Sequence, residues 1–114
     1  MRTLDLSTPG DFEGEYLESI RRQDGCDVLA LRAPDGERVR VMVHATMRGI
    51  VEALNEARNS ALRCNSAFRA RVVLRSHGRR ELPKGKRGVC IVDWAVGRYG
   101  KNEPPPQWDW TRFE

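Results

Sequence analysis

The chain has 114 residues, of which 39% are hydrophobic and 32% charged, which suffices for one core beneath a densely charged surface. These values exclude two independent domains and a wholly disordered chain. No stretch reaches the roughly 18 uncharged apolar residues of a membrane-spanning helix, and no apolar leader follows the start, so we expect a cytoplasmic protein. The three cysteines are widely spaced without a C-x-x-C pair, which indicates neither a disulfide framework nor a zinc site.

Charge is segregated along the sequence. Residues 1–56 carry 7 basic and 11 acidic side chains, residues 57–101 carry 12 and 2, and residues 102–114 carry 1 and 3. Arginine supplies 17 of the 20 basic residues, and its planar guanidinium binds phosphate through two hydrogen bonds at once. This distribution predicts a basic face for a polyanion.

The N-terminal half predicts three strands. Residues 1–11 are rich in turn formers and predict an irregular segment. Residues 13–22 predict a first strand that ends at an Asp-Gly turn. The apolar run 26–33 predicts a second strand, closed by the turn Pro-Asp-Gly. Residues 38–44 alternate valine with arginine, methionine and histidine, which predicts a third strand with one apolar and one cationic face.

The pattern then changes to a helical period. Apolar residues between Met47 and Leu62 recur at helical spacing, with Thr46 placed to cap the helix and Gly49 weakening its first turn. Residues 67–75 alternate again and predict a fourth strand, with a second arginine face. Residues 76–88 predict a long basic loop.

The C-terminal part predicts one more strand and a tail. Residues 89–96 form an apolar run between glycines, typical of a buried fifth strand. Residues 101–114 lose all periodicity, and their three consecutive prolines favour an extended rod followed by aromatic residues. We therefore expect an irregular segment at 1–11, one domain at 12–100 and a tail at 101–114.

The predicted fold class is α+β, mostly β, with one helix between the third and fourth strands. This order of elements over about residues 13–99 resembles the OB-fold, a small five-stranded Greek-key barrel that often binds single-stranded nucleic acids. The resemblance implies a ligand face on the second and third strands, with the basic loop beside it. It rests on element order alone, without a family motif, and many members present stacking rings where this chain presents arginines.

Ten cations are candidates for phosphate contacts. They lie at spacings of two along predicted strands or in the basic loop, where a row of positive side chains suits a phosphate backbone. The candidates are Arg38, Arg40, Arg69, Arg71, Arg75, Arg79, Arg80, Lys84, Lys86 and Arg87. Arginines on alternate positions also occur as the solvated face of an ordinary sheet.

The tail carries the second candidate site. Trp108, Trp110 and Phe113 expose more apolar area than a solvated tail needs, which predicts a surface against which they pack. That surface is either the edge of the chain's own domain or a protein partner.

The sequence contains little that predicts catalysis. His44 and His77 belong to no metal-spaced set, and a triad drawn from Ser76, His77 and Cys90 has no motif behind it. We therefore expect a non-catalytic protein without cofactor or metal that binds nucleic acid, single-stranded DNA or RNA being favoured. The alternative is a protein-interaction module, an inhibitor or adaptor of phage type, that docks its basic face on an acidic protein.

Overall fold

The computed structural model describes residues 2–64, 68–81 and 88–114. Its strands are β1 (Arg2–Thr3), β2 (Gly10–Arg21), β3 (Asp27–Arg32), β4 (Arg38–Met42), β5 (Arg69–Arg80) and β6 (Val89–Tyr99). The helix α1 spans Ile50–Arg63, and the short 3₁₀ turns η1 and η2 span Ala45–Met47 and Trp110–Phe113. The predicted α+β class, mostly β with one helix, is confirmed.

The strands form one sheet in the order β1-β4-β3-β2-β5-β6. The long strand β2 joins its two halves, because residues 10–15 pair with β5 and residues 15–21 pair with β3. A register shift between Tyr16 and Glu18 lies where β2 passes from one partner to the other. All pairs are antiparallel except the short contact of β1 with β4.

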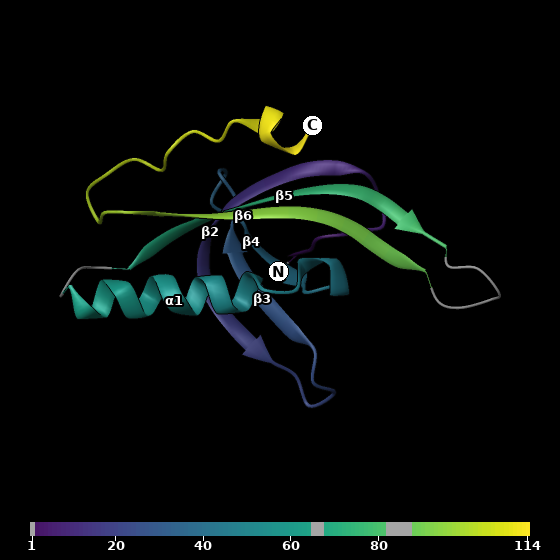
Figure 1. Ribbon diagram of the computed structural model, residues 1–114, viewed down its shortest axis with the longest axis horizontal. Coiled ribbons are helices and arrows are strands. Elements are labelled where there is room, and N and C mark those ends of the chain that lie inside the picture. The colour runs from purple at the N-terminus through teal and green to yellow at the C-terminus, as the bar shows by residue number, and fades with distance from the viewer. Residues whose placement is uncertain (1, 65–67, 82–87) are drawn as a thin grey trace.

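One face of the sheet packs on α1 and the other faces the C-terminal tail (Figure 1). The inner face contributes Leu29, Leu31, Val39, Val41 and Leu74 to the core, all at most 1% exposed. Ile50 and Leu54 of α1 close this core. Burial of such aliphatic side chains stabilises a domain by about 1.5–3 kcal/mol each, so the inner face supplies most of the driving force for folding.

The sheet differs from the five-stranded barrel that the sequence predicts. It has six strands, and in the described parts of the chain no backbone pairing joins β6 to β4 or β1. Other segments contact the β4 and β6 strands along the sides that a closed barrel would pair. β1 pairs with the outer edge of β4, and the Thr46 hydroxyl donates to the Cys90 carbonyl (2.6 Å) and accepts from the Val92 amide (3.1 Å) of β6.

The N-terminal segment and the helix start also differ from expectation. Arg2 and Thr3 form a strand within the segment predicted to be irregular, and Gly10 and Asp11 already belong to β2. The helix begins at Ile50, three residues after the predicted start. Gly49 is its N-cap, with φ of 96°, and Thr46 does not cap it because its hydroxyl is bound to β6.

The β5–β6 hairpin is longer than predicted. Ser76–Arg80 continue β5 instead of opening the basic loop, because a register shift at Gly78, with φ of 88°, lets the strand continue past an irregular residue. The remaining loop residues 82–87 lie outside the described residues.

Candidate nucleic-acid interface and tail contacts

The arginine row of β5 faces an acidic row on β2. Arg69, Arg71 and Arg75 alternate along β5, and Asp11, Glu13 and Glu15 alternate along the neighbouring strand on the same outer face. Arg75 binds Asp11 through two hydrogen bonds of 2.8 and 3.1 Å, Arg69 binds Glu15 at 3.1 Å, and Arg71 forms an ion pair with Glu13. Three of the ten candidate cations are therefore already paired within the sheet.

This pairing affects the protonation of the groups involved. The Arg75 guanidinium lowers the pKa of Asp11 below its usual value by hydrogen bonding. In turn, hydrogen bonds to Asp11 and Glu15 raise the pKa values of Arg75 and Arg69. Asp11 and Arg75 thus each favour the charged form of the other, and their two hydrogen bonds tie the Arg75 side chain to β2.

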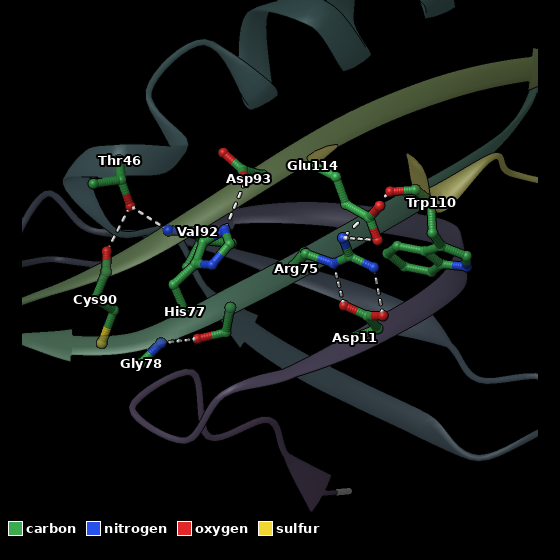
Figure 2. A network of polar contacts seen from close by, with 11 residues as sticks. Asp11, Thr46, Arg75, His77, Gly78, Cys90, Val92, Asp93, Trp110 and Glu114 are labelled. Carbon is green, nitrogen blue, oxygen red and sulfur yellow. Dashed lines mark hydrogen bonds and ion pairs between the residues drawn. The ribbon is translucent and has the colours of Figure 1, made fainter. Parts of the chain in front are cut away.

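The tail lies over the same half of the sheet (Figure 1). Arg75 donates to the Trp110 carbonyl (3.3 Å), has its guanidinium carbon 5.3 Å from the centre of the Trp110 ring, and lies 3.9 Å from the Glu114 carboxylate (Figure 2). Arg69 donates to the Lys101 carbonyl at 2.8 Å. The sheet is therefore bound to the tail at both ends of this arginine row.

The tail aromatics form a small cluster of their own. The Phe113 ring centre lies 5.3 Å from that of Trp108 and 6.2 Å from that of Trp110. All three side chains are half-buried. Val73, which lies between Arg71 and Arg75 on the outer face of β5, is only 2% exposed. The structure thus places the tail against its own domain, and binding of these aromatics to a separate partner stays a prediction.

Deletion of residues 103–114 is expected to lower the melting temperature by several degrees. The deletion removes the aromatic cluster and three contacts of Arg75, which we expect to cost on the order of 1 kcal/mol, or about 4 °C for a domain of this size. Thermal unfolding by circular dichroism measures the change. Trp110→Ala in the full chain removes only part of these contacts and should lower the melting temperature less. An unchanged melting temperature together with loss of an oligomer in sedimentation would place the tail on a second molecule instead.

The other candidate cations have a different environment. Arg38 and Arg40 project from β4 on the outer face, and Arg79 and Arg80 lie at the far end of β5. All four are exposed, and none forms an ion pair within the described ranges. Lys84, Lys86 and Arg87 lie outside those ranges. Of these four, Arg38 and Arg40 lie on the outer face, whereas Arg79 is in register with Cys90 and borders a hollow beside the N-terminal segment.

Arg40 borders a hollow of about 580 Å³ at the β2–β3–β4 surface. Ile20, which is 49% exposed, lines it together with Val28 and Met42, and Arg22 lies on its rim. The lining contains no carboxylate, although Arg22 itself forms an exposed pair with Asp24 (3.3 Å). This surface combines apolar area with guanidinium groups.

Ser76 and His77, two of the residues considered for catalysis, form structural hydrogen bonds. Ser76 is 4% exposed, donates to the Leu6 carbonyl (2.5 Å) and accepts from the Gly78 amide (3.1 Å). His77 bonds to Asp93 at 2.7 Å on the outer face (Figure 2). Ser76 is therefore tied to the N-terminal segment and is not presented to solvent as a nucleophile.

Neither a metal site nor a membrane helix is found in the described residues. They contain no group of three or more His, Cys, Asp or Glu side chains able to hold a metal ion. Their one α-helix is too short and too polar to cross a membrane.

The sequence contains a signal for the acidic row that the predicted first strand, residues 13–22, did not include in full. Asp11, Glu13 and Glu15 have the same spacing of two as the arginines of β5, and complementary rows of this kind indicate neighbouring strands. The spacing alone does not give the register, and only the structure shows that Arg75 lies opposite Asp11 and Arg71 opposite Glu15.

Comparison with known proteins gives no relative. No protein-family model matches the chain, and neither the curated proteins nor the solved structures contain a significant match.

Proposed function

We propose that this protein is a non-catalytic nucleic-acid-binding module with an OB-like, partly open sheet. The observation that carries the proposal is the contrast between the two rows of outer-face arginines. Those of β5 are neutralised by β2 and the tail, whereas Arg38 and Arg40 of β4 are exposed, unpaired among the described residues and two residues apart. Unpaired guanidinium groups in a row suit the phosphates of an extended strand.

The hollow beside Arg40 favours single-stranded over double-stranded nucleic acid. Its apolar lining of Ile20, Val28 and Met42 is suited to the face of an unpaired base, and Arg40, which forms no ion pair among the described residues, lies beside it to bind an adjoining phosphate. The bases of a duplex are stacked on one another and do not reach such a lining. The resemblance to the OB-fold also implies a ligand face on the second and third predicted strands. These strands correspond to β3 and β4, which border the hollow.

The proposal is tested by fluorescence-anisotropy titration of labelled single-stranded DNA, RNA and duplex at several salt concentrations. Arg38→Glu combined with Arg40→Glu is expected to weaken single-strand binding and to reduce the slope of log affinity against log salt by about two, one per lost phosphate contact. The matched control is Arg48→Glu with Arg63→Glu, two exposed arginines outside the sheet that change the net charge equally.

Equal losses in the two double variants would show that only net charge matters, which contradicts a site on β4. Absence of binding to any nucleic acid at low salt would instead favour the alternative function, docking of the basic face on an acidic protein.

A further inference from the structure

A pocket of about 390 Å³ lies on the other half of the outer face, between the sheet and the tail. It opens beside Arg71 and Tyr99, is bordered by Glu13 and Arg32, and has Pro105 and Gln107 of the tail as one wall. Its volume falls within the range of roughly 300–1,000 Å³ typical of small-molecule sites. The pocket is separate from the hollow beside Arg40, so what it binds does not depend on the nucleic-acid proposal.

The Tyr99 hydroxyl is the unusual feature of this pocket. Tyr99 is 5% exposed, and no group of the described residues meets its buried hydroxyl with good hydrogen-bond geometry. The Arg69 guanidinium lies over the ring face, 4.5 Å from its centre. A buried hydroxyl without a partner costs about 1–3 kcal/mol, so its retention beside a pocket points to a ligand atom as its partner. Burial raises the pKa of Tyr99, which keeps the hydroxyl protonated and able to donate. The nearby Arg69 guanidinium contributes only a secondary lowering of the Tyr99 pKa.

The charges around the pocket favour an anion. Arg69 and Arg71 are balanced by Glu15 and Glu13, whereas Arg32 forms no ion pair within the described parts of the chain. The charged residues that line the pocket are Glu13, Glu15, Arg32 and Arg71, and Glu15 is paired with Arg69 beside it. Both carboxylates are thus bound to other arginines, which leaves the Arg32 guanidinium available to an anion. Arg71 contacts Glu13 through one nitrogen, Nη2, which leaves other N–H groups of a side chain that is only 13% exposed.

Two prolines add apolar surface to the pocket. Pro34 follows β3 and Pro105 belongs to the tail, and both line the pocket. Pro106 lies beside β6 at Gly97, where an added Cβ would be 3.8 Å from the proline ring, an ordinary van der Waals contact. A ligand here would meet both hydrogen-bond donors and proline rings.

We propose that this pocket binds a small organic oxyanion, a carboxylate or phosphate ester carrying a ring or other apolar body. Its oxygens accept hydrogen bonds from the Tyr99 hydroxyl and the Arg32 guanidinium, and its body lies against the prolines. The tail thus serves as one wall of a ligand site in addition to covering the sheet.

Isothermal titration calorimetry on the full chain tests the proposal with four probes: phenyl phosphate, benzoate, inorganic phosphate and acetate. We expect saturable binding of phenyl phosphate or benzoate, with the preferred one identifying the anion, and weaker binding of the two probes without a ring. Tyr99→Phe and Arg32→Gln should each weaken binding about tenfold or more. Arg63→Gln, which removes an exposed helix arginine outside the pocket, should leave it unchanged.

Tyr99→Phe also gives a readout that a merely structural role would not produce. Because no described residue meets the hydroxyl with good hydrogen-bond geometry, its removal should leave the melting temperature of the unliganded chain unchanged or raise it while ligand affinity falls. Saturable binding of no probe, equal losses in Arg63→Gln, or unaltered affinity in Tyr99→Phe would each overturn the proposal.

Discussion

Gly14→Val is expected to destabilise the domain by about 3 kcal/mol, at the upper end of the usual cost of overpacking. Gly14 is buried in β2 where the strand passes from β5 to β3. A Cβ there would lie 2.9 Å from the Arg32 carbonyl oxygen and 3.3 Å from the Leu31 Cβ, and the backbone of β3 cannot move aside without disturbing the sheet. The melting temperature should fall by roughly 12 °C, at about 4 °C per kcal/mol.

Gly10→Val is the matched control for this substitution. Gly10 opens the same strand, is exposed, and would place its Cβ with no atom within 4 Å. Since valine suits an extended strand, the change in unfolding free energy should stay within about 0.5 kcal/mol. Similar losses at both positions would mean that β2 tolerates no side chain for reasons other than the contact with β3.

Thr46→Val is expected to cost about 2 kcal/mol. The substitution keeps the shape of the side chain but removes the hydroxyl that bonds both the Cys90 carbonyl and the Val92 amide (Figure 2). Each lost hydrogen bond contributes about 0.5–1.5 kcal/mol, and the half-buried backbone groups of β6 would have no replacement partner in the sheet. Chemical denaturation measures the loss.

Hydrogen exchange locates the effect of this change. The Val92 amide should exchange faster in Thr46→Val, whereas Thr46→Ser, which retains the hydroxyl, should preserve most of its protection. Thr8→Val, at an exposed position with a local contact to Asp5 (3.4 Å), serves as the control for loss of a threonine hydroxyl. Unchanged exchange at Val92 in Thr46→Val would show that η1 does not protect the β6 edge.

Because Arg71 of β5 is paired, its replacement does not measure ligand binding alone. Arg71 is 13% exposed and bound to Glu13, and it lines the pocket between the sheet and the tail. Its replacement therefore disturbs both the sheet and this pocket. Arg38 and Arg40 have no such contacts among the described residues, and their replacement addresses binding alone. The two halves of the outer face therefore need to be tested separately.

Local sequence determined the type and order of most elements. Alternating valines defined the strand around Val41, helical spacing defined the helix that contains Leu54, and the turns at Gly25 and Gly36 were marked by residues that accept the positive φ of 84° and 90° found there. These signals depend on residues close together in the chain, so they can be recognised without knowing the rest of the fold.

Only the tertiary structure decided which segments lie side by side. The partners of Arg75 are Asp11, far earlier in the sequence, and Trp110 and Glu114 in the tail, and the partner of the β6 edge is Thr46. Such contacts depend on how β2 bridges two halves of the sheet, which periodicity does not encode. For that reason the sequence revealed ten candidate cations, but only the fold distinguished Arg69, Arg71 and Arg75 of β5, neutralised by their neighbours, from Arg38 and Arg40 of β4, left unpaired in the described structure.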